Sequence, residues 1–362
     1  MNILIAGGGT GGHLFPALAI GNEWKKRHND CIVHYVGSTF GIEASLLPNQ
    51  NVTYTLLPIR GLQRGLSFRS VGRNLLLPWR LFVSYYRAKR LFNRISPLVV
   101  IGTGGYASAL PVKIAIQKGI PVVLQEQNSF PGLTTRMFAE RAEKVCLGFE
   151  TTTNLLNTNT VFTGNPVRYS QPEGNRILAA ETFNLNPNMP TVFLTGGSQG
   201  SAILNHIMNI ASSLFVNAGI QVLWQTGKHH FSRYQSKNNE SIRVLPFIED
   251  MALAYSISDT IISRAGAIAL AELAVWGKPS VLVPLHSAAG DHQRKNAEAM
   301  ATVGASIMIE EPHLTPEKLF SLIKQIISDK DRISEMSKAA KSMSKPEATS
   351  HIVDIIEEIA RV

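Results

Sequence analysis

The chain has 362 residues, of which 44% are hydrophobic and 17% charged, enough for two α/β domains that each bury a core. No apolar run reaches the ~18 residues that a membrane-spanning helix requires, and because the first residues already match a strand we expect no secretion signal. The two cysteines lie inside apolar, strand-like runs, so we expect buried thiols in a reducing compartment.

Short apolar strands alternate with helical stretches along the whole chain. This alternation is typical of an α/β protein whose parallel sheets carry helices on both faces. The pattern restarts after Gly164–Arg168, where Pro166 interrupts it, so we expect a domain boundary there, with Tyr169–Asn188 leading into the second domain. The expected strands are Ile3–Ala6, Ile32–Val36, Leu98–Ile101, Val122–Gln125, Lys144–Leu147, Val192–Thr195, Val222–Gln225, Ile242–Pro246, Thr260–Ser263 and Ser280–Pro284.

The first predicted strand runs into a turn, Gly7–Gly12, that formally matches the dinucleotide-binding pattern GxGxxG. A dinucleotide site also needs an acidic residue at the end of the second strand, to hold the adenosine ribose. The second predicted strand instead ends in Gly37-Ser38-Thr39, and the turn lacks the GK[ST] of a P-loop. We therefore expect neither a nicotinamide site nor an ATP site here.

The segment Arg60–Arg94 carries nine basic side chains and no acidic one, interleaved with aliphatic and aromatic residues and interrupted by Pro78. One interpretation is an interfacial helix that inserts apolar side chains into a bilayer while its basic residues meet anionic headgroups. Another is a helix that packs on its own domain with a solvated basic face. Nucleic-acid binding is disfavoured, because the clustered aliphatics suit lipid better than bases. The candidate membrane residues are Leu76, Trp79, Arg80, Phe82, Arg87 and Arg90.

Three more small-residue turns follow predicted strands, at Gly102–Ser108, Thr195–Ser201 and Ser263–Glu272. The first amides of a helix lack internal partners and carry the positive end of its dipole, so such turns suit a diphosphate at the carboxyl edge of a sheet. In the third turn, Glu272 is placed to accept hydrogen bonds from a ribose diol. The alternative for this turn is an ordinary helix start with a solvated glutamate.

A metal-dependent sugar transferase would show an Asp-x-Asp cluster at the end of a strand. The match at Asp329–Asp331 falls in a polar segment that we interpret as a turn between two helices. We therefore expect no catalytic metal and no cofactor.

The ordered motifs together strongly resemble those of the MurG family over nearly the whole chain. They are GGTGGH (Gly8–His13), GTGGY (Gly102–Tyr106), EQN (Glu126–Asn128), GNPVR (Gly164–Arg168), GGSQG (Gly196–Gly200), SRAGA (Ser263–Ala267) with Glu272, and DHQ with Asn296. The resemblance implies a GT-B fold, an α/β architecture of two Rossmann-like domains with parallel sheets facing a cleft. It also implies an acceptor and membrane-associating domain over 1–164 plus a C-terminal helix at about 345–362, and a donor-binding domain over 165–344.

The resemblance further implies a reaction and its partners. An inverting, metal-independent transferase would move N-acetylglucosamine from UDP-GlcNAc to the C4 hydroxyl of undecaprenyl-pyrophosphoryl-MurNAc-pentapeptide in peptidoglycan synthesis. Such an enzyme would serve cell shape and division as a peripheral protein on the cytoplasmic face of the inner membrane, together with other cell-wall synthesis proteins and without nucleic acid. The alternatives are another GT-B lipid glycosyltransferase, a nucleotide-sugar epimerase, or a non-catalytic scaffold at a membrane surface.

The family's site residues carry over by motif. His13 would act as the general base, bind the acceptor pyrophosphate or cap the loop. Two departures from the family pattern are Gln125, which stands where many relatives carry histidine, and a longer loop containing Gly290. The implied donor contacts are Thr10, Gly11, Gly12, Asn128, Arg168, Ser198, Ile248, Ala267, Ile268, Ala269, Leu270, Ala271, Glu272 and Gln293, with Asn296 and Tyr106 as further candidates.

Overall fold

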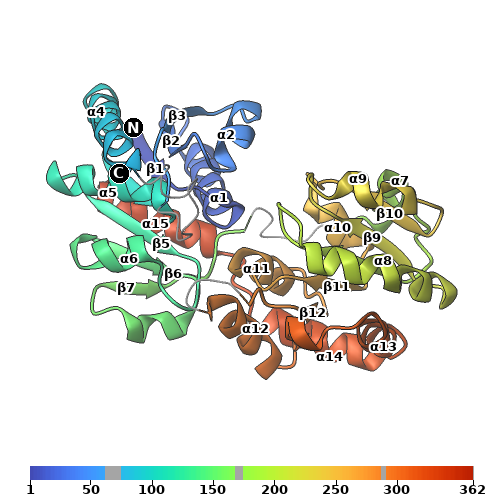
Figure 1. The fold of residues 1–362 in the computed structure, drawn as a ribbon. Coiled ribbons are helices and arrows are strands. Elements are labelled where there is room, and N and C mark those ends of the chain that lie inside the picture. Colours follow the sequence, from blue (N-terminus) through green and yellow to red (C-terminus); the bar gives the residue numbers. More distant parts are fainter. Residues whose placement is uncertain (62–74, 168–173, 287–290, 362) are drawn as a thin grey trace. The chain divides into compact units, whose positions relative to one another are not determined.

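The computed structural model describes residues 1–61, 75–167, 174–286 and 291–361. Contacts divide the chain into two compact units: Met1–Arg168 with Glu347–Val362 (the first unit), and Tyr169–Pro346 (the second unit). Each unit contains its own parallel sheet with helices on both faces (Figure 1). The α/β expectation is therefore confirmed within each unit.

The sheet of the first unit has the strand order β3-β2-β1-β4-β5-β6-β7, with all neighbours parallel. Strand order reverses between β1 and β4, so the turns that follow these two strands meet at the carboxyl edge, where open α/β sheets bind ligands. The strands are β1 Asn2–Ala6, β2 Ile32–Ser38, β3 Thr53–Leu57, β4 Val99–Gly102, β5 Val122–Glu126, β6 Lys144–Leu147 and β7 Thr160–Phe162.

Helices cover both faces of this sheet. One face packs against α1 and α15, with Trp24 of α1 and Ile352 of α15 in the same core, and the other packs against α4 and α5. The C-terminal helix is also tied to α1 by ion pairs of Arg27 with Asp354 (2.6 Å) and Glu357 (3.1 Å). The helices are α1 Gly11–Arg27, α2 Glu43–Leu46, α4 Leu77–Ile95, α5 Tyr106–Gln117, α6 Leu133–Phe138 and α15 Ala348–Ala360.

The sheet of the second unit has the order β10-β9-β8-β11-β12-β13, again with parallel neighbours and a reversal, here between β8 and β11. Its strands are β8 Thr191–Thr195, β9 Gln221–Gln225, β10 Ile242–Leu245, β11 Thr260–Ser263, β12 Ser280–Leu282 and β13 Ser306–Met308. Its helices are α7 Arg176–Phe183, α8 Ala202–Asn217, α9 Phe231–Tyr234, α10 Met251–Ile257, α11 Ala267–Val275, α12 His292–Thr302, α13 Pro316–Ile327 and α14 Lys330–Ser342.

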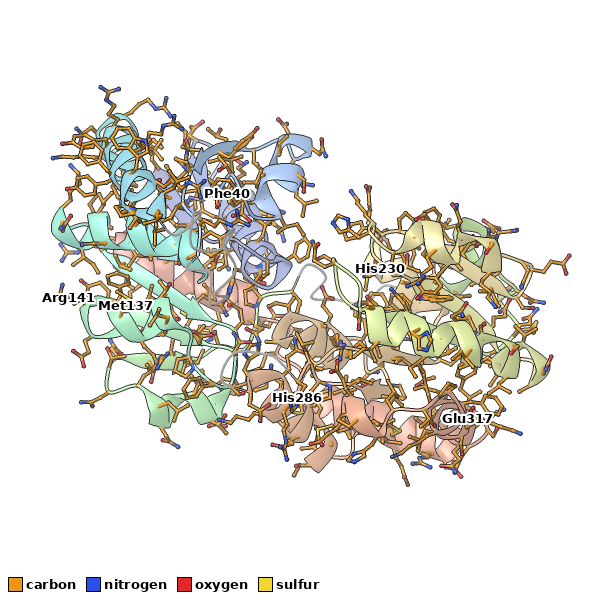
Figure 2. The ribbon with its side chains drawn as sticks, viewed as in Figure 1. Phe40, Met137, Arg141, His230, His286 and Glu317 are labelled. Carbon is orange, nitrogen blue, oxygen red and sulfur yellow. The ribbon has the colours of Figure 1, made fainter. Side chains whose placement is uncertain are left out.

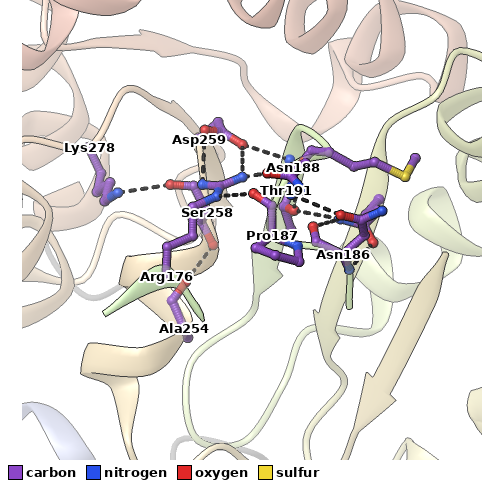
Figure 3. Close-up of polar contacts among 11 residues, drawn as sticks. Arg176, Asn186, Pro187, Asn188, Thr191, Ala254, Ser258, Asp259 and Lys278 are labelled. Carbon is purple, nitrogen blue, oxygen red and sulfur yellow. Dashed lines mark hydrogen bonds and ion pairs between the residues drawn. The ribbon is translucent and has the colours of Figure 1, made fainter. Parts of the chain in front are cut away.

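A polar network fixes the amino edge of the second sheet (Figure 3). Arg176 of α7 forms an ion pair with Asp259 at 3.0 Å, and the same carboxylate oxygen accepts from the amide of Thr191 at 2.7 Å. Nearby, the ammonium group of Lys278 donates to the carbonyl of Ser258 at 2.8 Å, and burial lowers the pKa of Lys278 to about 8. These contacts lie where β8 and β11 begin, so they stabilise the edge opposite the small-residue turns.

All ten strands expected from the sequence are present, with ends that differ by at most two residues. Three further strands, β3, β7 and β13, were not expected from the sequence; they lie at sheet edges and carry few fully buried side chains. Pro78, expected to interrupt the basic segment, instead occupies the first turn of α4, where its missing N–H costs no helical hydrogen bond.

Candidate functional site

In the first unit, the turns after β1 and β4 interlock. The amide of Thr103 donates to the carbonyl of Ala6 at 2.9 Å, and its hydroxyl donates to the carbonyl of His13 at 2.8 Å. Gly105 has φ +75°, and a side chain there would clash with the carbonyl of Gly8. The glycines of GTGGY therefore allow the two turns to touch.

His13 lies in the first turn of α1, and its ring is held through Nδ1. That nitrogen is 2.9 Å from Oε1 of Gln127 and 3.1 Å from the carbonyl oxygen of Thr103. Because both neighbours are acceptors, the hydrogen-bond network assigns the proton of the neutral ring to Nδ1 and the lone pair to Nε2. A Cβ on Gly104 would come within 2.8 Å of Nδ1, so this glycine is needed for the ring position.

Gln127 is the residue that orients His13. It was not among the site residues that the motifs implied. Its amide nitrogen donates to the carbonyl of Thr103 at 2.8 Å and to the side chain of Gln125, which leaves its oxygen facing the imidazole. Gln125 in turn donates to Asn165 at 3.1 Å, and Asn165 donates to the carbonyl of Gln127 at 3.0 Å. Gln125 thus joins the EQN and GNPVR motifs.

Glu43 is a fully buried carboxylate beneath the first glycine-rich turn. It accepts from the amide of Gly9 at 2.8 Å and from the amide of Ser38 at 2.7 Å. A side chain on Gly8 or Gly41 would clash with this carboxylate. A carboxylate does lie at the end of β2, contrary to the sequence expectation, but it binds the protein's own loop instead of facing a ribose.

Asn128 and Tyr106, two predicted site residues, lie around the same turns. Asn128 is anchored by the carboxylate of Glu126, which accepts from the backbone N–H of Asn128 at 3.1 Å and from its side-chain NH₂ group at 3.2 Å. The ring of Tyr106 packs so closely on Gly9 that a Cβ there would lie 2.9 Å from it, and partial burial raises the pKa of Tyr106. The first unit therefore gathers Thr10, Gly11, Gly12, His13, Tyr106 and Asn128 at one sheet edge.

In the second unit, α11 begins at the reversal point of the sheet. Gly266 is its N-cap residue, and a glycine has no side chain with which to cap the first amides. Arg264 fixes the preceding turn, because it donates to the hydroxyl of Ser201 at 2.7 Å and forms an ion pair with Glu311 at 2.5 Å. The amides of α11 and the turn that contains Ser198 thus follow adjacent strands, an arrangement suited to an anion.

Gln225, at the end of β9, connects the predicted donor contact Ile248 with the turn that contains another, Ser198. Its amide nitrogen donates to the carbonyl of Gly197 at 3.2 Å, while its oxygen accepts from the amide of Ile248 at 2.8 Å. The amide of Ile248 is thus already paired, so the expected contact of the Ile248 backbone with the donor's base would use its carbonyl. No sequence motif had indicated a role for Gln225.

Glu272 lies on α11, where the sequence predicted a ribose contact. Its Oε2 accepts a hydrogen bond of 2.7 Å from the hydroxyl of Tyr255 on α10. Burial and the adjacent carboxylate hold the pKa of Tyr255 well above its ordinary value, so the phenol remains a donor. Glu272 is therefore oriented by the protein and is not simply a solvated residue at a helix start.

The remaining predicted residues differ in their surroundings. Gln293 is half-buried and accepts from the amide of Leu285 at 3.0 Å, which places it beside the longer loop. Asn296 is fully buried and donates to the carbonyl of Ala265 at 3.2 Å, so it supports the SRAGA turn, and its role as a donor contact stays a prediction. Arg168 and Gly290 lie outside the described residues.

Two family models match the chain: the glycosyltransferase family 28 N-terminal domain over residues 3–147 and the C-terminal domain over residues 191–352. A Chlorobium luteolum protein named UDP-N-acetylglucosamine--N-acetylmuramyl-(pentapeptide) pyrophosphoryl-undecaprenol N-acetylglucosamine transferase is 40% identical over 368 residues, covering 99% of this chain and 100% of that protein. The chain belongs to the MurG family of glycosyltransferases.

Further MurG-family proteins also match this chain over nearly its full length. A Flavobacterium psychrophilum protein of the same name is 36% identical over 357 residues, covering 98% of this chain and 96% of that protein. The crystal structure of Acinetobacter baumannii MurG matches with a TM-score of 0.73 and 29% identity, covering 99% of each chain. The expected GT-B fold, with two Rossmann-like units, is confirmed.

In this MurG-family chain, the described part of the basic segment from Leu77 onward lies in helix α4, which has two different faces. Buried residues such as Ala88, Leu91 and Phe92 pack into the core of the first unit, as the packing interpretation expected. Another stripe exposes Trp79 by 65%, and Phe82 and Tyr86 by 53% each. The rings of Trp79 and Phe82 stack with centroids 5.8 Å apart, and those of Phe82 and Tyr86 lie 4.7 Å apart.

Basic side chains flank this aromatic stripe. Arg87 and Arg90 are exposed, whereas Arg80 stacks over the ring of Phe40, 4.9 Å from its centroid. Phe40 is labelled in Figure 2. Arg80 therefore has a structural contact that the sequence did not indicate, and Arg64, Arg69 and Arg73 lie outside the described residues. Within the described parts of the chain, no helix combines the length and apolar character needed to cross a bilayer.

Proposed function

We propose that this protein transfers N-acetylglucosamine from UDP-GlcNAc to undecaprenyl-pyrophosphoryl-MurNAc-pentapeptide, the reaction named for its relatives. The observation that carries the proposal is the reversal point of the second sheet. There the start of α11, whose N-cap residue is a glycine, the turn with Ser198, and the oriented carboxylate of Glu272 follow adjacent strands. These groups suit a diphosphate and the ribose attached to it.

The chemistry is a direct displacement at the donor sugar. The C4 hydroxyl of the acceptor sugar attacks C1, the C1–O bond to UDP breaks, and the configuration inverts to a β-1,4 linkage. Negative charge grows on the departing diphosphate, so the amides at the start of α11 stabilise the transition state more than the ground state. The hydroxyl proton passes to a base, and Nε2 of His13 carries the lone pair that this role requires.

Removing the carboxylate of Glu272 tests the donor site. We expect Glu272→Ala to weaken UDP binding by about 1–3 kcal/mol, the range for lost hydrogen bonds to a charged group. Calorimetric titration with UDP, UDP-GlcNAc, UDP-GalNAc and NAD measures affinity and selectivity together. Glu298→Ala, on the exposed surface of α12, is the control and should bind as wild type. Unchanged UDP affinity in folded Glu272→Ala would rule out the ribose assignment.

The reaction is expected to need no metal. In the one Asp-x-Asp match, Asp329 caps α14 by accepting from the amide of Arg332 at 3.0 Å, and so lies in the predicted turn between two helices. Turnover should therefore persist in saturating chelator. Loss of activity that Mg²⁺ or Mn²⁺ restores would reveal a metal site.

We further propose that α4 attaches the first unit to the anionic cytoplasmic surface of the inner membrane, which holds the acceptor's lipid tail. The exposed aromatic stripe supplies apolar area, and the flanking arginines supply charge. An interfacial helix binds a membrane through burial of apolar side chains and through attraction of its basic residues to anionic headgroups. Each basic residue contributes about 1 kcal/mol near the surface. Association with other cell-wall synthesis proteins remains a proposal drawn from the family resemblance.

Vesicle binding by two variants of α4 separates the apolar contribution from the electrostatic one. Replacing Trp79, Phe82 and Tyr86 by Ser should weaken binding to anionic vesicles with little dependence on salt, because apolar burial is lost. Replacing Arg87 and Arg90 by Glu should weaken binding most at low salt, where screening is weak. Ile203→Ser with Ile210→Ser, which removes exposed apolar residues from α8, is the control and should bind normally. If neither α4 variant loses binding, another surface attaches the protein.

A further inference from the structure

We infer that Tyr255 is a positioning residue that holds Glu272 in the orientation needed to bind ribose, and thereby helps to select ribonucleotide donors. This inference rests on the proposed donor site. The hydroxyl of Tyr255 donates to Oε2 of Glu272 at 2.7 Å, and the tyrosine is 2% exposed. Tyr255 contributes to donor binding without itself lying at the exposed edge of the sheet.

Packing explains the ring of Tyr255 but not its hydroxyl. The ring contacts Phe193 of β8 with centroids 6.4 Å apart and Trp276 at the end of α11 with centroids 5.6 Å apart. A phenylalanine would make the same apolar contacts and would avoid the cost of burying a polar group. The hydrogen bond to Glu272 is the contact in which the hydroxyl takes part.

The position of Tyr255 also connects the two halves of the nucleoside site. It belongs to α10, whose N-cap residue Asp250 accepts from the amide of Ala252 at 3.0 Å. Just before this cap lies Ile248, whose amide is held by Gln225. One short segment therefore carries the predicted base contact and the group that orients the ribose contact.

A carboxylate oxygen has two lone pairs, so Oε2 can accept from the phenol and from a ribose hydroxyl together. The fixed donor restricts rotation of the glutamate side chain before the ligand arrives. Preorganisation of this kind improves affinity because less conformational freedom is lost on binding. The gain should appear only for ligands whose hydroxyl groups meet the carboxylate.

The test compares UDP with 2′-deoxy-UDP on wild type and on Tyr255→Phe by calorimetry. We expect Tyr255→Phe to bind UDP about tenfold more weakly, the effect of losing a hydrogen bond to a charged group. We also expect the ratio of the two ligands' affinities to fall, because the loss should be smaller for the deoxy compound. Both ligands are titrated on the same sample, so this ratio does not depend on the fraction of protein that is folded.

Two controls sharpen the result. Tyr234→Phe removes another buried tyrosine hydroxyl from the second unit, where the ring packs on Trp224, and should leave both affinities unchanged. In a Glu272→Ala background, adding Tyr255→Phe should weaken UDP no further. Equal weakening of both ligands, or no weakening while Glu272→Ala alone loses affinity, would overturn the inference and leave the donor site standing. If Glu272→Ala also binds UDP normally, the ribose assignment of the proposed donor site is wrong.

Discussion

Replacing His13 by Ala is expected to lower turnover on the lipid-linked acceptor by about two to three orders of magnitude, the usual effect of losing a general base. UDP affinity should stay close to wild type, because the proposed nucleotide site lies in the other unit. Steady-state rates with calorimetric UDP titration measure both quantities. His351→Ala, an exposed histidine of α15 in the same unit, is the matched control. An equally large loss of UDP binding would place His13 at the donor phosphates.

The pH profile of a Gln127→Glu variant separates the two roles considered for His13. A carboxylate beside Nδ1 would favour the protonated imidazole. If His13 is the base, the acidic limb of the rate profile should move to higher pH, because the neutral ring is the active form. If His13 instead binds the acceptor pyrophosphate as a cation, activity should extend further into the alkaline range.

Glu43→Gln is expected to lower the free energy of unfolding by about 2–3 kcal/mol. The side chain keeps its size, but an amide group cannot accept from both backbone amides, Gly9 and Ser38, and its nitrogen would face one of these donors. Denaturant unfolding measures the loss. Glu140→Gln, an exposed glutamate of the same unit, should change the stability by less than about 0.5 kcal/mol.

The same Glu43→Gln variant should also lose turnover. The substitution loosens the glycine-rich turn at Gly9, which leads directly into the first turn of α1, where His13 lies. UDP binding should be retained, which distinguishes a local effect from global unfolding. Wild-type stability together with wild-type turnover would show that the carboxylate neither stabilises the loop nor positions the histidine.

The sequence predicted the elements whose signals are local. Buried strands are recognisable in the sequence as apolar runs. The turns after β1, β4 and β8 are recognisable by their glycines, which a positive φ or a close contact between backbone segments requires. The edge strands β3, β7 and β13 were missed because their side chains are only partly buried and carry no clear apolar run. The amphipathic character of α4 was visible too, but not which stripe packs inward.

The sequence by itself determined the α/β alternation, the family and the motifs that lie at the sheet edges. Only the tertiary structure decided how those motifs are held: Glu43 under Gly9, Gln127 beside His13, Gln225 beside Ile248, and Tyr255 beside Glu272. The partners in these pairs are 34, 114, 23 and 17 residues apart in the chain. The spacing of hydrophobic residues and the residue types found in turns are local properties of the sequence. Such pairs, in contrast, form only once parallel strands and their helices bring distant segments together.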